Sequence, residues 1–155
     1  SSDLAKDLEI IVRICLSTGA RWGEAEKLKR SQITAGKVTF IKTKGKRNRT
    51  IPLDPKIIAE LPKKNGTLFS PCYYAFRSAL ERARIDLPAG QLTHVLRHTF
   101  ASHFMMNGGN ILVLQKILGH TDIKMTMRYA HFAPNHLEEA LKLNPLNFSG
   151  KYNDN

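Results

Sequence analysis

The chain has 155 residues, of which 42% are hydrophobic, and its 24 lysines and arginines outnumber its 13 acidic residues to give a formal charge of +11. This length and apolar content predict one folded domain and exclude a disordered basic tail. No apolar run approaches the roughly 20 residues of a membrane span, and the two cysteines lack disulfide or metal spacing. The positive charge favours a nucleic-acid partner, because binding releases condensed counterions.

The first half of the chain is predicted to hold a small antiparallel sheet between helices. Apolar residues recur at helical spacing from Leu4 to Cys15, and the pair Thr18-Gly19 ends this helix. Val38 and its apolar neighbours favour a strand. The expected elements are helices over 4–18, 22–28 and 55–61, strands over 37–42 and 49–53, and a basic hairpin tip over 43–48.

The second half is predicted to consist of helices. An apolar stripe marks the buried side of the longest one, namely Leu92, Leu96, Phe100 and Phe104. This places His94, Arg97 and Ala101 on a different face. The expected helices cover 72–84, 92–106, 111–118 with Gly119 as C-cap, 122–130 and 134–143, followed by a loose tail over 144–155. The predicted fold class is mainly α with a small antiparallel β-sheet (α+β), with residues 1–143 as one domain.

The densest positive cluster contains no acidic residue and is a candidate DNA contact: Lys42, Lys44, Lys46, Arg47 and Arg49. A solvated hairpin tip would show the same pattern, so charge alone does not decide between the two interpretations. Lys44 in this tip is also a candidate proton donor, because an ammonium group near other cations loses its proton more readily.

Five further residues can converge on one ligand. His94 and Arg97 are three positions apart, so on a helix their side chains project from one face, although an ordinary polar helix face has the same spacing. Arg21 and His120 each follow a glycine that ends a predicted helix. Tyr129 lies nine residues after His120.

A phosphodiester suits this set of residues. The guanidinium groups of Arg21 and Arg97 would clamp its oxygens and stabilise the charge that grows as phosphorus becomes five-coordinate. The 13 acidic residues are scattered, which disfavours a metal mechanism, and we expect neither a metal nor a cofactor. The nucleophile must then come from the protein, and Tyr129 is the candidate if nearby His and Arg residues ease the loss of its proton.

Five motifs occur in a fixed order: residues 18–25 (TGARWGEA), 43–45 (TKG), 94–98 (HVLRH), 118–120 (LGH) and Tyr129. Together they resemble the tyrosine recombinase (phage integrase) family over about residues 5 to 140, which implies the catalytic-domain fold of that family. The resemblance implies that Arg21 and Arg97 bind the scissile phosphate. It further implies that His94 assists proton transfer at the nucleophile, that His120 hydrogen-bonds a phosphate oxygen and that Tyr129 forms a 3′-phosphotyrosyl link.

The resemblance assigns two more residues. Lys44 matches the hairpin lysine that protonates the leaving 5′ oxygen, with Lys42 and Lys46 as alternatives in the same tip. Glu24 matches an acidic residue that supports the catalytic residues without contacting the DNA itself.

The implied activity is site-specific DNA recombination, as in phage integration and excision. A phosphotyrosyl ester conserves the energy of the broken phosphodiester, so strands can be exchanged and resealed without ATP. Type IB topoisomerase-like strand relaxation uses the same chemistry and remains an alternative. A non-catalytic basic DNA-binding module is the second alternative, and it predicts that Tyr129 is dispensable.

The partners implied by the resemblance are double-stranded DNA attachment sites, a homo-oligomer from dimer to tetramer on DNA, a host DNA-bending protein and a directionality factor. The expected location is the cytoplasm of the bacterial host, without a membrane. The amino-terminal DNA-binding domains of the family are not expected within these residues. The carboxyl-terminal segment would pack on a neighbouring protomer or on its own domain through Leu137, Leu141, Leu143, Leu146 and Phe148.

Overall fold

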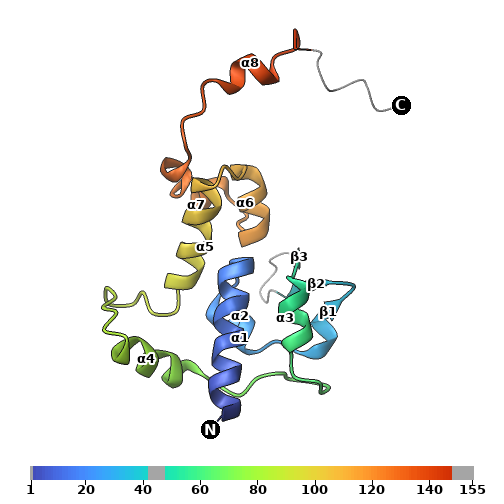
Figure 1. Ribbon diagram of the computed structural model, residues 1–155, viewed down its shortest axis with the longest axis vertical. Helices are drawn as coiled ribbons and strands as arrows, with labels where there is room; N and C mark the ends of the chain where they lie inside the picture. Colours follow the sequence, from blue (N-terminus) through green and yellow to red (C-terminus); the bar gives the residue numbers. More distant parts are fainter. Residues whose placement is uncertain (1, 42–47, 148–155) are drawn as a thin grey trace.

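The computed structural model describes residues 2–41 and 48–147 and is mainly helical, with a three-stranded antiparallel sheet (Figure 1). The predicted α+β fold class is confirmed. The elements in chain order are α1 (Ser2–Thr18), α2 (Trp22–Glu26), the 3-10 helix η1 (Arg30–Gln32), β1 (Ile33–Thr34), β2 (Lys37–Phe40), β3 (Arg49–Pro52), α3 (Pro55–Glu60), α4 (Tyr73–Arg82), α5 (Val95–Met106), α6 (Ile111–Leu118), α7 (Ile123–Met127), the 3-10 helix η2 (Ala130–Phe132) and α8 (Glu139–Leu143).

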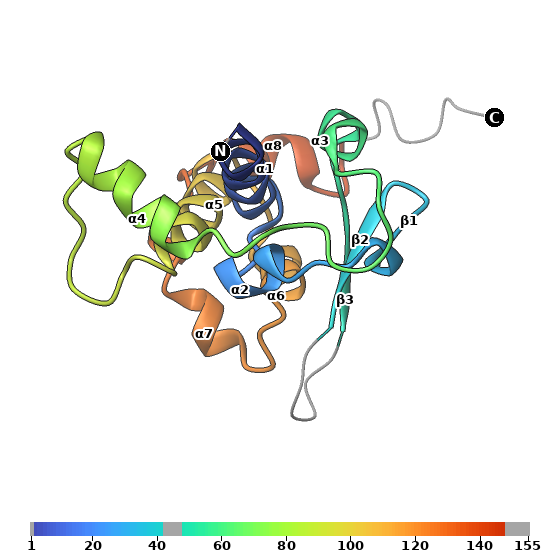
Figure 2. The ribbon, with the colours of Figure 1, turned by 90° about the horizontal axis from the view of Figure 1, so that it is seen from below.

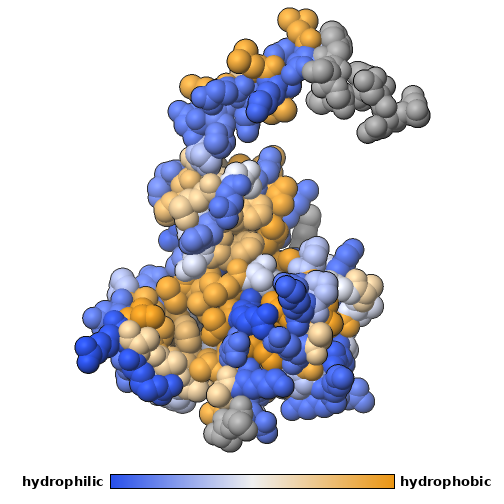
Figure 3. Space-filling view, in the orientation of Figure 1, coloured by the Kyte–Doolittle hydropathy of each residue, from blue (hydrophilic) through white to orange (hydrophobic). Residues whose placement is uncertain are grey.

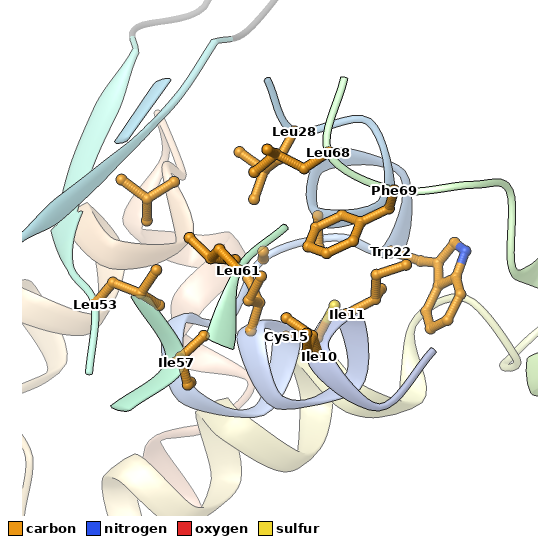
Figure 4. Packing of buried hydrophobic residues seen from close by; sticks show 14 of the residues in the cluster. Ile10, Ile11, Cys15, Trp22, Leu28, Leu53, Ile57, Leu61, Leu68 and Phe69 are labelled. Carbon is orange, nitrogen blue, oxygen red and sulfur yellow. The ribbon is translucent and has the colours of Figure 1, made fainter. Parts of the chain in front are cut away.

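The long helix α1 lies at the centre of the fold. It contacts α2, α3, α4 and α5, and Figure 2 shows it between the sheet with α3 on one side and α4 on the other. Four of its hydrophobic residues are at most 2% exposed: Ile10, Ile11, Ile14 and Cys15. Trp22, Leu28 and Leu68 close around this row (Figure 4). Burying one such aliphatic side chain contributes about 1.5–3 kcal/mol, so the cluster fixes the carboxyl end of α1, where the candidate site begins.

The sheet orients the chain before and after residues 42–47, which lie outside the described part. Its order is β1-β2-β3, and β2 pairs with β3 so that Phe40 lies opposite Arg49 and Val38 opposite Ile51. Residues directly opposite in an antiparallel pair share a face, and Val38, Phe40 and Ile51 face the core. Arg49 therefore begins β3 on the buried face. The strand β1 has only two residues, too few for the alternation that identifies a strand in a sequence.

The predicted apolar stripe of the longest helix of the second half packs against the core, but the most deeply buried face of this helix is a different one. In α5 the fully buried positions are Arg97, Ala101 and Met105, spaced one turn apart, whereas the apolar stripe is only partly buried. The cause is that α5 packs against α1 and also against α6 and η2, so that more than one of its faces is covered. The deepest face is the one that carries Arg97.

The segment containing α8 extends away from the rest of the chain (Figures 1 and 3). The helix begins at Glu139, later than the predicted start at Pro134. Its leucines and those beside it are 65–83% exposed: Leu137, Leu141, Leu143 and Leu146. None of the helices in the described part of the chain has the length and apolar character needed to cross a membrane.

Candidate active site

The side chain of Arg97 joins two helix ends. Its guanidinium donates one hydrogen bond to the carbonyl of Gly19, after α1, at 2.8 Å, and another to the carbonyl of Leu118, at the end of α6, at 2.5 Å. Carbonyl groups at a helix C-terminus have no partner within the helix and carry partial negative charge. The buried cation satisfies both, and Arg97 is only 5% exposed. Arg97 therefore holds together the two segments that continue to Arg21 and His120.

Glycine lets both helices end where the chain turns. Gly19 and Gly119 have φ angles of 73° and 71°, in the left-handed region that a residue with a Cβ adopts only at a cost. A Cβ on Gly19 would also lie 2.6 Å from the ring of Phe100 on α5. The predicted glycine stops are confirmed, and each is followed within two residues by a candidate catalytic side chain.

Glu24 on α2 connects three parts of the site. Its two carboxylate oxygens accept hydrogen bonds from the Arg49 guanidinium at 2.7 and 2.8 Å, and one also accepts from the backbone N–H of Arg21 at 2.9 Å. The Arg21 guanidinium lies 3.8 Å from the same carboxylate. Arg49 in turn donates to the carbonyl of Ile117 in α6 at 2.7 Å. Glu24 thus fixes the Arg21 segment against β3 and the carboxyl end of α6.

Arg49 is not available as the DNA contact that was expected. Its side chain is 6% exposed, its guanidinium is bonded to Glu24 and Ile117, and it lies 4.9 Å from the centre of the Phe40 ring. The physical reason is the strand register, which places Arg49 on the buried face. The other members of the basic cluster lie outside the described residues, so their DNA contacts stay a prediction: Lys42, Lys44, Lys46 and Arg47.

The charges at this site act strongly on one another. Burial alone would raise the pKa of Glu24, but the hydrogen bonds and charge of Arg49, together with the amide and charge of Arg21, outweigh it and lower the pKa to about 2. Burial and the charges of Arg21 and Arg49 lower the pKa of Arg97 to about 9, so it remains charged at neutral pH. Three guanidinium groups against one carboxylate leave two uncompensated positive charges, which favour an anionic ligand.

We predict that Glu24→Gln lowers the free energy of unfolding by about 3 kcal/mol at pH 7, because the substitution leaves the Arg49 cation buried without its counter-charge. Ionised Glu24 adds stability above its unfolded pKa of 4.5, and this is lost as the pH falls toward its folded value of about 2. Urea unfolding at pH 7, 5 and 3 measures both effects.

The matched control for this prediction is Glu60→Gln. Glu60 forms an ion pair with Arg13 in which both side chains are at least one-third exposed, so its removal should change stability by less than about 1 kcal/mol. Equal stability losses in the two variants would contradict the role given to Glu24.

Tyr129 lies at the beginning of η2 and is 6% exposed. Its ring packs in a small cluster with Ala101, Met105, Leu114 and Leu118. Its hydroxyl is hydrogen-bonded to Nδ1 of His98 on α5. Burial raises the pKa of the Tyr129 hydroxyl, and the positive charges of Arg128 and Arg97 act in the opposite direction. The hydroxyl is therefore protonated at neutral pH but within electrostatic reach of Arg97.

The three histidines of the site have different surroundings. His120 follows the α6 C-cap, and its Nδ1 lies 2.8 Å from the hydroxyl of the buried Thr126 in α7. His94 is the exposed N-cap of α5, with its ring centroid 6.1 Å from that of His98. Burial lowers the pKa of His98, as do the charges of Arg128, His94 and Arg97. His98 is thus neutral at pH 7.

The structure brings most of the predicted residues together but adds one. The segments that carry Arg21 and His120 meet at Arg97, where α1 and α6 end. Tyr129 packs against Ala101, on the same face of α5 as Arg97. His98 ends the motif of residues 94–98, but the sequence alone assigns no role to it. Within the described residues, no three His, Cys, Asp or Glu side chains are grouped so that they could hold a metal ion.

Comparison with known proteins identifies this arrangement. Residues 70–136 match the phage integrase family. The solved catalytic domain of bacteriophage HP1 integrase superposes with a TM-score of 0.88 at 62% sequence identity, covering 94% of this chain and 90% of that chain. The chain belongs to the phage integrase family. The family resemblance inferred from the five motifs is therefore confirmed.

Other members of the family are similar over most of the chain. It is 72% identical to the integrase of Escherichia phage 186 over 141 residues and 66% identical to that of Haemophilus phage HP1 over 140 residues. Each match covers 90% of this chain but 42% of the relative, so the chain spans less than half the length of these relatives. The XerH site-specific recombinase bound to its difH DNA superposes with a TM-score of 0.64 at 25% identity, covering 92% of this chain and 52% of that chain.

Proposed function

We propose that this chain is the catalytic part of a site-specific tyrosine recombinase, which cuts and rejoins DNA through a 3′-phosphotyrosyl intermediate. The observation that carries the proposal is the bridge made by Arg97, which unites the Arg21 and His120 segments on one side of α5 while its charge reaches Tyr129. The integrases among the relatives support it, as does a structural neighbour that is a recombinase bound to DNA.

In the proposed reaction, each residue acts on one phosphate. Arg21 and Arg97 hold its non-bridging oxygens and stabilise the five-coordinate transition state, and a single such arginine can contribute about 10³ to 10⁵ in rate in phosphoryl transfer. His120 donates a hydrogen bond to a phosphate oxygen. The Tyr129 oxygen attacks phosphorus, and Lys44 protonates the leaving 5′ oxygen.

A purely DNA-binding module would need only the positive charges of this site. Such a module would not require the Tyr129 hydroxyl to be hydrogen-bonded to the neutral His98. It would also not require this hydroxyl to lie within electrostatic reach of Arg97. Strand relaxation of the topoisomerase type would use the same groups. The phage integrases among the relatives favour recombination over relaxation.

We further propose partners that suit this reaction. The substrate would be double-stranded DNA carrying attachment sites, processed in the cytoplasm of the bacterial host by a dimer to tetramer of the protein. The exposed leucines around α8 would pack on a neighbouring protomer, since the segment that carries them extends away from the rest of the chain in Figure 3. A host DNA-bending protein and a directionality factor would set the geometry and direction of recombination.

The activity can be tested without knowing the attachment site. Duplex DNA with a randomised core and a fixed nick is incubated with the protein, so that the short 5′-hydroxyl fragment diffuses away and rejoining is prevented. We expect a protein–DNA adduct that resists denaturation, and sequencing of its DNA should return one common core. Cleaved DNA without attached protein would indicate a nuclease, and retention that denaturant abolishes would indicate a binding module; either result would overturn the proposal.

A further inference from the structure

The hydroxyl of Tyr129 has one described side-chain partner, and it is not the histidine that the family resemblance assigns to proton transfer. Nδ1 of His98 is hydrogen-bonded to the hydroxyl, and the two rings lie 5.9 Å apart between centroids. His94 lies one turn away, exposed, with its ring centroid 6.1 Å from that of His98. The residue in contact with the reacting atom is therefore His98.

We infer that His98 accepts the proton of the Tyr129 hydroxyl when its oxygen attacks the DNA phosphorus. This inference rests on the proposed recombinase function and names the base for its first step. Geometry comes first, because a general base must lie within hydrogen-bond reach of the proton that it removes. His98 meets this condition on the helix that also supplies Arg97, so the base and the phosphate clamp share one rigid element.

The chemical step balances with the groups already named. The O–H bond of Tyr129 breaks and its proton passes to Nδ1 of His98, which becomes an imidazolium. The tyrosine oxygen forms a bond with phosphorus, and the bond between phosphorus and the 5′ oxygen breaks. The 5′ oxygen leaves with a proton from a separate acid, assigned to Lys44. In rejoining, the 5′ hydroxyl gives its proton back to the acid assigned to Lys44 and attacks phosphorus. The bond between phosphorus and the tyrosine oxygen breaks, and His98 returns its proton to that oxygen.

The surroundings of His98 keep it ready to accept a proton. Its neighbours from the packed elements are cationic or neutral: Arg97 and His94 belong to α5 and its cap, and Arg128 and Tyr129 come from the segment after α7. Burial and these positive charges lower the pKa of His98, so the ring is neutral at pH 7. A hollow of about 480 Å³ beside the pair is lined by Ser102, Arg128 and Phe132 among others.

The test uses His98→Asn, whose side-chain oxygen can occupy the place of Nδ1 and hold the hydroxyl but cannot take its proton at neutral pH. Single-turnover adduct formation on the nicked DNA should slow about a hundredfold or more, the usual contribution of a general base. The control His103→Asn changes an exposed histidine on the same helix and should react at the wild-type rate.

The pH dependence separates proton transfer from simple positioning. In the wild type, the rate should rise with pH and level off below pH 6.5, since the pKa of His98 is lowered from that value. In His98→Asn the rate should keep rising toward the ionisation of tyrosine near pH 10. His98→Ala, which also lacks the hydrogen bond, should show the same rising profile.

The outcomes distinguish a failure of this inference from a failure of the proposed recombinase function. If the wild type forms an adduct and His98→Asn forms it equally fast with an unchanged pH profile, His98 is not the base and the recombinase function stands. A faster reaction in His98→Ala would likewise overturn the inference, because it would make His98 a restraint on Tyr129. If the wild type forms no adduct with any core, the proposed function itself fails.

Discussion

Replacing Tyr129 with phenylalanine is expected to reduce covalent attachment to DNA below detection while leaving the fold intact. The hydroxyl supplies the nucleophile, so its loss removes the reaction itself. The ring would remain in its cluster with Leu114 and Leu118, and only the hydrogen bond to His98 would be lost. Such a bond contributes about 0.5–1.5 kcal/mol to stability. A denaturing gel measures the adduct, and thermal unfolding measures the fold.

The control for this substitution is Tyr74→Phe, which changes an exposed tyrosine on α4 and should leave adduct formation unchanged. DNA binding without covalent attachment should survive in Tyr129→Phe, because all of the described arginines are kept. An adduct that forms at the wild-type rate in Tyr129→Phe would mean that another group attacks the DNA.

The second large effect is expected from Arg97→Lys, which should lower the cleavage rate by at least about a hundredfold. A lysine keeps the positive charge, but it cannot donate to the Gly19 and Leu118 carbonyls while also presenting two parallel donors to a phosphate. Single-turnover cleavage of nicked DNA measures the loss. The matched control is Arg77→Lys on α4, where the side chain is largely exposed, and it should leave the cleavage rate unchanged.

Arg97 also has a structural role, which its burial reveals. In Arg97→Ala two buried carbonyls lose their donor, and each unsatisfied group costs about 1–3 kcal/mol. We therefore expect Arg97→Ala to melt at a lower temperature than Arg97→Lys, with both inactive. A cleavage rate in Arg97→Lys within a few-fold of the wild type would contradict the idea that Arg97 clamps the phosphate.

The sequence predicts the helix ends that are set by local features, namely capping residues, glycines and apolar runs. Asn110 and Gly119 bracket an almost entirely apolar run, and α6 has the predicted bounds because capping and hydrophobicity agree there. The glycine stop after α1 likewise follows from a residue that tolerates a left-handed conformation. These two stops were sufficient to mark Arg21 and His120 as candidates.

Long-range pairing accounts for what the sequence did not predict. Nothing local indicates that Arg97 faces inward, because its burial depends on carbonyls 78 and 21 positions away in the chain. The pair of Glu24 and Arg49 spans 25 positions, so local charge groups Arg49 with the basic cluster although the strand register buries it. The role of His98 likewise depends on its contact with Tyr129, which is 31 positions away in the chain.

The central claim is that Tyr129 itself becomes joined to the DNA, and peptide mapping of the trapped adduct tests it most directly. The chain has four tyrosines, so the modified peptide identifies the nucleophile. After nuclease digestion, mass spectrometry should find the remaining nucleotide attached through a 3′-phosphate to Tyr129 alone. Attachment to Tyr73, Tyr74 or Tyr152, or through a 5′-phosphate, would contradict the account.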